Sequence, residues 1–505
     1  MSFLFCLLFA LLCAQPFSPA FAKAKVLILG GGFSGLQAAQ TLKENGVDFL
    51  LLEGSDHVGG RAASVTVDQI PTDSFLWSRD PAKPDGDPVD PWFKKCGLTW
   101  SELGSIDLKL INGSGADVTA TALARQYEFY SILSAAASDY DRGLIPDSRS
   151  PSLEALLTMY GWHAKEPIDW FVEWYFFELD FGLRAHAQSA AHYLFLHSPT
   201  SGIDSGSHFQ YSKNELKSSK FLPNCMKDMI FSGSLQNNIV LNAKVTSIAH
   251  NSSGVTVTTE SGETYEGDYA IVTFSLGVLQ RNMIEFRPQL PFWKRLAWSE
   301  FDMMTTTILY VVFERNLSLS AEYFTYLTHD LDKSWIRDVT PLLTHLPEYV
   351  NKTVLHLHTT GQYAARLIDQ AWSKTFDDIT AIMVIMFGEK PSNIYMSSPG
   401  NDPLLLGGNP AWPVGASWAD FDDVRRPVGR LYFAGDLCWY YRVVRSALVS
   451  GNETANVVTS CMNGGSCTYR QFAQTSSPEE CPTTSGESRV GAGMVAVALL
   501  CLLVM

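Results

Sequence analysis

Three glycines follow an unbroken apolar run near the start of the chain, in the sequence KVLILGGGFSGLQAAQTLKENGVDFLLLE. The apolar run before Gly30 is typical of a parallel strand that is buried on both faces. After Gly35, apolar side chains recur at helical spacing until Gly46, and a second apolar run ends at Glu53. The pattern predicts a strand–turn–helix–strand unit with the glycines at its first turn.

Each glycine has a distinct expected role in this turn. Gly30 permits the tight bend, Gly32 lets a diphosphate approach the backbone, and Gly35 lets the helix pack closely on the strand. The predicted cofactor site also includes the neighbouring Phe33 and Ser34, because the helix N-terminus faces the phosphates. A lone motif of this kind would be a weak signal, and its alternative is a glycine-rich turn. The flanking strands favour dinucleotide binding.

An acidic residue and a second glycine pair complete this predicted site. Glu53 lies 18 residues beyond Gly35, where its carboxylate is expected to hold the ribose hydroxyls of an adenosine. The segment DHVGGR follows and adds Gly60 and Arg61 to the predicted cofactor site. Arg61 is expected to form a charge-assisted pair with the diphosphate.

Composition narrows the classes of partner. The chain has 505 residues and a net charge of −15, with 37 Lys and Arg against 52 Asp and Glu. This length favours two domains. The acidic balance argues against a nucleic-acid partner and is compatible either with a cationic ligand or simply with a solvated acidic surface. We find no spacing of His or Cys that predicts a metal site.

The two ends predict secretion or display at the cell surface. Residues 1–22 read as a signal peptide, 461–489 as a Cys-, Ser- and Thr-rich spacer, and 490–505 as an apolar tail. The tail fits a lipid-anchor (GPI) signal, and a simple tail anchor or an unprocessed end are its alternatives. The even number of cysteines outside the two ends permits disulfides. Predicted N-glycosylation sites are Asn112, Asn251, Asn316 and Asn351, whereas Asn452 lies in a predicted helix and is expected to be unmodified.

A distant segment, RPVGRLYFAGDLCWYYRVVRSALVSGNETANVV, adds a strand, a Gly-Asp turn and a helix. With the first motif and the segment WPVGASWADFDD, it resembles the flavin-containing amine oxidase family, nearest to secreted polyamine oxidases. The resemblance favours FAD over NAD, since such flavoenzymes often carry a GGR segment. It implies an α/β fold in which a Rossmann-like FAD-binding domain is interleaved with an α+β substrate domain. The FAD domain would comprise residues 24–95, 236–300 and 412–460, and the substrate domain residues 96–235 and 301–411.

The resemblance also implies further site residues. Val245 would contact the adenine through its backbone, Asp436 would lie near the ribityl–diphosphate region, and Val444 would lie beside the flavin. Acids among aromatics, Glu178 and Asp180, are candidates for holding substrate ammonium groups, although a partly exposed helix face would explain them equally well. The aromatic pair Tyr440 and Tyr441 would wall the flavin or simply belong to the core. A buried structural thiol is preferred for Cys438 over a covalent flavin link.

The chemistry implied is hydride transfer from an amine to FAD, with reoxidation by oxygen to hydrogen peroxide. One departure stands out: the family commonly has a lysine where this chain has Ile308. The nearby Thr305, Thr306 and Thr307 are expected on the solvent side of a β-strand. Three functions therefore remain: a polyamine-like amine oxidase, another FAD oxidoreductase (prenylcysteine-oxidase-like or a natural-product enzyme), or an FAD-binding surface protein that has lost catalysis.

Overall fold

The buried apolar run at the start of the chain forms the centre of the largest sheet. The computed structural model describes residues 23–68, 70–73, 87–100, 108–145, 150–178, 182–197, 214–215, 222–321, 323–327, 337–342, 351–438 and 443–472. One compact unit extends to Arg470, and a second begins at Gln471. The predicted signal peptide, the apolar tail, Asp180, Tyr440 and Tyr441 lie outside the described residues.

The first sheet has eight strands, with the order β12-β9-β10-β11-β1-β2-β8 and β20 paired to β11. Strand β1 pairs in parallel with both β11 and β2, and its last four residues are fully buried, as the unbroken apolar run predicts. All eight strands fall within the ranges expected for the FAD domain. They are β1 (Ala24–Leu29), β2 (Phe49–Leu52), β8 (Ile239–Val240), β9 (Val245–His250), β10 (Val255–Thr259), β11 (Thr264–Val272), β12 (Glu285–Arg287) and β20 (Leu431–Phe433).

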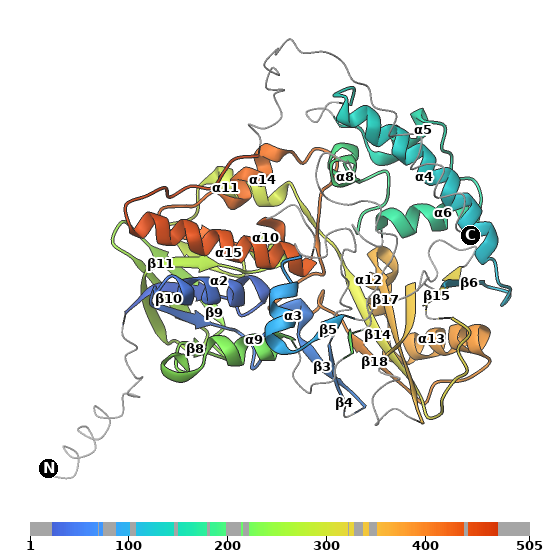
Figure 1. Ribbon diagram of the computed structural model, residues 1–505, viewed down its shortest axis with the longest axis horizontal. Coiled ribbons are helices and arrows are strands. Elements are labelled where there is room, and N and C mark those ends of the chain that lie inside the picture. The colour runs from blue at the N-terminus through green and yellow to red at the C-terminus, as the bar shows by residue number, and fades with distance from the viewer. Residues whose placement is uncertain are drawn as a thin grey trace, which may run out of the picture. The chain divides into compact units, whose positions relative to one another are not determined.

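Two long helices lie side by side over this sheet, α2 (Phe33–Glu44) and α15 (Val443–Met462) (Figure 1). A Cβ placed on Gly451 of α15 would lie 2.2 Å from the carbonyl oxygen of Ser34, so the close crossing requires a glycine there. Their apolar side chains share one core with β1, β2, α3 (Asp90–Cys96) and α9 (Leu222–Ile230). This core fixes the start of α2 against the end of β1.

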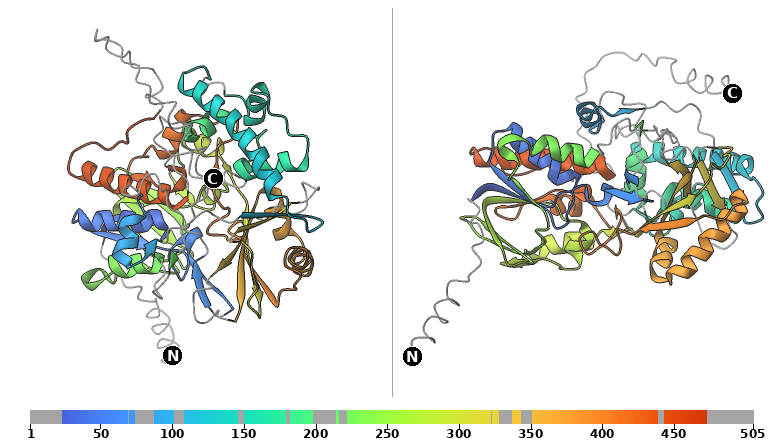
Figure 2. Two further views of the ribbon diagram at one scale, coloured as in Figure 1. Left: turned by 45° about the vertical axis from the view of Figure 1, so that its right-hand side comes forward. Right: turned by 90° about the horizontal axis from the view of Figure 1, so that it is seen from below.

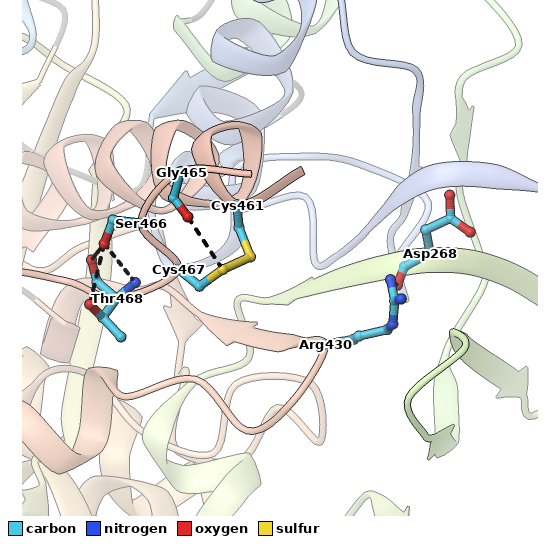
Figure 3. The surroundings of a disulfide bond; sticks show 7 residues. All are labelled: Asp268, Arg430, Cys461, Gly465, Ser466, Cys467 and Thr468. Atoms are coloured by element: carbon cyan, nitrogen blue, oxygen red, sulfur yellow. Dashed lines mark hydrogen bonds between the residues drawn. A yellow bond between two sulfur atoms is a disulfide. The ribbon is translucent and has the colours of Figure 1, made fainter. Parts of the chain in front are cut away.

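Two disulfides pin this region. Cys96–Cys225 joins α3 to α9, and Cys461–Cys467 closes the end of α15 (Figure 3). Cys438, in the short helix Asp436–Cys438, is a buried free thiol. Smaller helices α10 (Leu276–Gln280), α11 (Phe292–Ser299) and α14 (Trp418–Arg425) complete this half of the molecule.

The second large sheet has four strands in the order β16-β17-β14-β18, and it lies apart from the first (Figures 1 and 2). Its strands are β14 (Thr306–Phe313), β16 (Arg337–Leu342), β17 (Thr353–Thr360) and β18 (Asn393–Ser397). One face packs on α12 (Gly361–Asp369) and α13 (Trp372–Phe387). All eight residues of β14 are buried, so the expectation that Thr306 and Thr307 face solvent is wrong: the strand is central and both its faces are covered.

A helical layer and four two-stranded ladders complete the fold. The helices are α4 (Thr119–Asp141), α5 (Leu153–Met159), α6 (Pro167–Glu173), the π-helical turn Trp174–Glu178 and α8 (Ala190–His197). The ladders pair β3 (Ser64–Val67) with β4 (Ile70–Asp73), β5 (Thr99–Trp100) with β7 (Asn214–Glu215), β6 (Leu108–Asn112) with β15 (Tyr323–Leu327), and β13 (Asp302–Met303) with β19 (Pro410–Ala411). No described helix combines the length and the apolarity needed to cross a bilayer.

Candidate cofactor and active site

In the glycine-rich turn, the fold itself requires Gly30 and Gly35 but does not require Gly32. Gly30 adopts φ +114°, a conformation that favours glycine, and a Cβ on Gly35 would lie 1.9 Å from the Gly30 carbonyl oxygen. Apart from its two chain neighbours, no atom of the described residues would lie within 4 Å of a Cβ on Gly32. Backbone conformation therefore explains Gly30, and close packing explains Gly35. Gly32 instead leaves open backbone at the start of α2, as a close approach by a phosphate would require.

A buried hydroxyl lies in the first turn of the same helix. Phe33 and Ser34 are each only 4% exposed, and Phe33 belongs to the core. The hydroxyl oxygen of Ser34 has no hydrogen-bond partner among the described residues. Buried hydroxyls normally have partners, so this one is a donor that fits a phosphate oxygen at the helix N-terminus.

Glu53 lies directly after β2, beside the glycine turn. Its two carboxylate oxygens accept hydrogen bonds from the backbone N–H groups of Gly31, at 2.5 Å, and Ser55, at 2.8 Å. These bonds fix the carboxylate at the carboxyl edge of the parallel strands, where dinucleotide ribose groups bind in sheets of this type. Val245 is near the same edge: the N–H of Ala243, two residues earlier, bonds the Glu53 carbonyl at 2.8 Å.

The second glycine pair folds back onto the first turn. The N–H of Gly59 donates to the Gly31 carbonyl at 3.0 Å, and Gly59 forms a parallel bridge with Gly32. Gly60 adopts φ +56°, and its added Cβ would lie 3.5 Å from the Gly32 Cα. Backbone from two segments is thus brought together beside Glu53, and we call residues 30–35, Glu53 and residues 59–61 the cradle.

Arg61 connects the cradle to two distant segments. Its guanidinium makes a bidentate pair with Asp436, with both N–O distances 2.8 Å, and also donates to the Gly408 carbonyl. The side chains are 24% and 9% exposed, so the pair is largely withdrawn from water. The structure therefore places Asp436 beside Arg61, where we had expected the diphosphate to be its anion. Both side chains adjoin the cradle, and Val444 is buried in the first turn of α15 nearby in sequence.

A second buried ion pair was not expected from the sequence. Arg445, in the first turn of α15, pairs with Asp87 at 2.6 Å, and the Asp87 side chain is 1% exposed. The Asp87 carboxylate also accepts from the Val89 N–H at 3.0 Å. Arg445 lies in the segment that carries the family resemblance, whereas Asp87 lies in a Pro- and Asp-rich stretch where no local signal distinguishes it from its neighbours.

The substrate candidates differ in how far the structure describes them. Glu178 ends the π-helical turn and is 8% exposed, so a partly exposed helix face does not describe it. Its carboxylate lies against the N-terminus of α12, where a Cβ on Gly361 would contact it, and it pairs with Arg184 at 3.4 Å. Burial raises its pKa, while Arg184 opposes that rise.

Ile308 is 7% exposed and lies on the face of β14 that packs against the β3–β4 hairpin. Its direct cross-strand neighbours are His358 on β17 and Ser397 on β18. Burial raises the pKa of the Cys438 thiol to about 11, which keeps it neutral at physiological pH. Among the described residues no cluster of three or more His, Cys, Asp or Glu is arranged to hold a metal ion.

The sequon asparagines lie in described segments. Asn251, Asn316 and Asn351 are exposed and Asn112 is half-buried. Asn452 is exposed on α15, and its side-chain oxygen accepts from the Thr41 hydroxyl at 2.9 Å. Glycosylation at these sites stays a prediction.

The residues of the cradle fit FAD on the observations above: open backbone at Gly32, a buried hydroxyl donor at Ser34 and an oriented carboxylate at Glu53. The cofactor would rest with its diphosphate over the start of α2 and its ribose beside Glu53.

Comparison with known proteins agrees with this geometry. Residues 28–75 match an NAD(P)-binding Rossmann-like domain, and residues 155–459 match the flavin-containing amine oxidoreductase family. Polyamine oxidase 6 of Oryza sativa subsp. japonica is 26% identical over 471 residues, covering 88% of this chain and 93% of the relative. Polyamine oxidase 1 of Zea mays is 25% identical, covering 92% and 96%.

Solved structures show the same fold. A putrescine oxidase bound to putrescine has a TM-score of 0.69 at 18% identity, covering 86% of this chain and 98% of that one. Cyclohexylamine oxidase from Brevibacterium oxydans IH-35A has a TM-score of 0.69 at 17% identity, covering 88% and 100%. The predicted α/β fold with a Rossmann-like dinucleotide domain is confirmed. Because the family match spans more than half of the sequence, this chain belongs to the flavin-containing amine oxidase family.

Proposed function

We propose that the protein binds FAD and oxidises a polyamine-like amine, giving an imine that hydrolyses to an aldehyde, with hydrogen peroxide as the second product. One observation carries the proposal: a backbone cradle, open at Gly32, adjoins the buried Arg61–Asp436 pair, and Arg61 reaches Gly408 in the segment leading from the second sheet. A nucleotide site is thereby joined to the region expected to bind substrate.

FAD, when bound, supplies the hydride acceptor and the route of electrons to oxygen. The residues of this chain would bind and position the cofactor. Gly32 and Ser34 would receive the diphosphate, Glu53 would bind the ribose, and the Arg61–Asp436 pair would fix the segment that follows β20 against the cradle.

Glu178 is the described acid that best suits an ammonium group. The Glu178 carboxylate is buried. Its ion pair with Arg184 is long, at 3.4 Å, and the Arg184 side chain is 35% exposed. A cation arriving from solvent would gain a desolvated carboxylate partner, which is stronger than an exposed one. The names of the rice and maize relatives and the putrescine-bound structure support an amine of the polyamine class.

An anaerobic bleaching screen of the yellow holoprotein across polyamines, monoamines, amino acids and thioethers tests this function. Amino acids and thioethers are expected not to bleach the flavin, whereas amines of the polyamine class are expected to bleach it. Glu178→Gln should raise the KM for them about tenfold with a smaller change in kcat, and Glu128→Gln, an exposed acid on α4, is the matched control. Bleaching by thioethers alone, or by no compound, would contradict the proposal.

Ile308 favours a second candidate, an FAD oxidoreductase that reacts poorly with oxygen. A buried isoleucine occupies the position where the family commonly has a lysine, so no ammonium group is present there. Reduced flavin should then reoxidise slowly in air, measured by stopped-flow after anaerobic reduction. Rapid peroxide release during amine oxidation would exclude this candidate and support the first.

We also propose that the protein is secreted or held at the cell surface. Disulfides such as Cys96–Cys225 persist in oxidising compartments, and exposed sequons such as Asn251 suit glycosylation. Expression in a eukaryotic host should give a glycosidase-sensitive protein in the medium or on the cell surface. A cytosolic, unglycosylated product would contradict this proposal.

A further inference from the structure

One face of the second sheet carries two polar pairs with a mixed pair, Ile308 and His358, between them, and we call these six residues the polar row. Register places Thr306 opposite Thr360, Ile308 opposite His358, and Tyr310 opposite His356. Directly opposed residues of an antiparallel pair share a face, and alternate residues continue it. Three such pairs extend over about 13 Å, since each residue adds roughly 3.3 Å. That length suits a small extended molecule.

The row starts beside the cradle. A Cβ on Gly408 would lie 2.2 Å from the Thr306 hydroxyl oxygen, so Gly408 and Thr306 are in close contact. The Gly408 N–H donates to the Met304 carbonyl at 2.6 Å, and its own carbonyl accepts from Arg61. The polar row therefore runs outward along β14 and β17 from the residues that adjoin the predicted cofactor.

His356 lies at the far end of the row and is buried. Its side chain is 3% exposed, and neither ring nitrogen has a hydrogen-bond partner among the described residues. Its ring meets that of Tyr310 edge-on at 5.4 Å. Burial, with a smaller effect from His358, lowers the pKa of His356 to about 3, so the imidazole stays neutral with one donor and one acceptor nitrogen.

Thr306 lies at the other end of the row. The Thr306 hydroxyl is buried and also lacks a hydrogen-bond partner among the described residues. A buried polar atom that is left unpaired loses its hydrogen bonds to water without a replacement, which destabilises the folded state. Two such residues on one face, one at each end of the row, indicate that a polar molecule completes their hydrogen bonds.

We propose that His356 is a specificity-determining residue that binds the non-reacting end of the amine substrate, and that this end is a neutral group able to donate and accept, such as a hydroxyl or an amide. The inference rests on the proposed amine oxidation and names its substrate class more narrowly. A neutral imidazole offers no countercharge, so a second ammonium or a carboxylate at this end would be desolvated without compensation. A hydroxyl or amide matches both ring nitrogens.

The test uses the full-length holoprotein and compares three amines whose eight-carbon chains are long enough to extend along the row: aminooctanol, octylamine and diaminooctane. Anaerobic stopped-flow bleaching gives a Kd for each from the saturation of the reductive rate. Aminooctanol should bind about tenfold more tightly than the other two, the effect of one hydrogen-bonded group. His356→Phe should remove that advantage, and His356→Gln should keep most of it.

Thermal unfolding provides a readout that a structural histidine would not give. His356→Phe removes unpartnered polar atoms, so its melting temperature should equal or exceed that of the wild type. Leu357→Met, a buried change on the opposite face of β17, is the matched control and should leave the order of the three amines unchanged.

Equal loss of affinity for all three amines in His356→Phe would overturn this inference, as would an unchanged preference or a wild type that prefers octylamine or diaminooctane. A lowered melting temperature with the preference intact would identify His356 as structural. If no amine of any kind bleaches the flavin, the proposed function fails and this inference fails with it. Bleaching with an unaltered order contradicts the inference alone.

Discussion

The cradle and the polar row are two halves of one candidate site, and they are built in different ways. The cradle is mostly backbone: Gly30, Gly32 and Gly35 lie within six residues, and Glu53 is at the end of the next strand. The row consists of side chains from β14 and β17, which antiparallel pairing brings together from about 50 residues apart. A site formed by backbone conformation can be recognised in a short stretch of sequence, whereas a site formed by strand pairing cannot.

The largest expected effect is a loss of FAD binding in a variant that still folds. Gly32→Val should weaken FAD binding by at least about 100-fold, because its side chain would fill the space left for the diphosphate. The melting temperature of the apoprotein should change little, since an added Cβ meets no atom within 4 Å in the part of the chain that the structure describes, its chain neighbours aside. Fluorescence titration with FAD measures the first effect, and calorimetry measures the second.

Gly35→Ala gives the contrasting result in the same motif. Its Cβ would lie 1.9 Å from a backbone oxygen, so the apoprotein itself should be destabilised by several kcal/mol, of order ~3. Gly113→Ala is the neutral control, with its nearest atom 3.7 Å away. Equal stability losses in Gly32→Val and Gly35→Ala would remove the distinction between ligand space and packing.

The Arg61–Asp436 pair tests how the cradle is joined to the rest of the site. Arg61→Met leaves a carboxylate that is 9% exposed without its bidentate partner, and it should cost about 2–3 kcal/mol of unfolding free energy. Adding Asp436→Asn should restore part of that loss and give a coupling above about 1 kcal/mol in a double-mutant cycle. Additive losses, measured by urea unfolding, would show that the pair is not coupled.

A titrating acid lies in the helical layer, far in sequence from the cradle. Burial raises the pKa of Glu173 to about 7, and the Trp162 indole N–H donates to it at 2.9 Å. The native state therefore keeps a proton that the unfolded state loses, so stability falls as the pH rises from about 4.5 to 7. Glu173→Gln should gain about 1–3 kcal/mol relative to the wild type at pH 8 and nothing at pH 4. An unchanged pH profile would refute this assignment.

The smallest effect concerns the hairpin beside the polar row. Lys352, next to β17, pairs with Asp68 of the β3–β4 turn at 2.6 Å and with Glu314 at 3.2 Å. All three side chains are at least a quarter exposed, so Lys352→Met should cost less than about 1 kcal/mol, and less still in high salt. A larger, salt-independent loss would show that this contact holds the hairpin over the row.

These contrasts explain what the sequence could predict. The strand–turn–helix–strand unit follows from apolar periodicity and glycine conformation, which are local properties. The Arg61–Asp436 pair joins residues 375 positions apart, and each was singled out through family resemblance without an indication that they meet. The expectation that Thr306 and Thr307 face solvent is wrong because threonine is polar and favours strands, so it suits an exposed strand face. Only the neighbouring strands show that this face is covered. His356 could not be singled out from the sequence, since histidines in a strand are usually structural.

The central claim is that bare backbone at the start of α2 holds the diphosphate of FAD. Titration of the purified full-length apoprotein with FAD, followed by flavin absorbance and fluorescence, tests it most directly. The account predicts saturable binding of one FAD per chain in the wild type and its loss in Gly32→Val. A wild-type protein that takes up no FAD at any concentration, or a Gly32→Val variant that binds it as tightly as the wild type, would contradict the account.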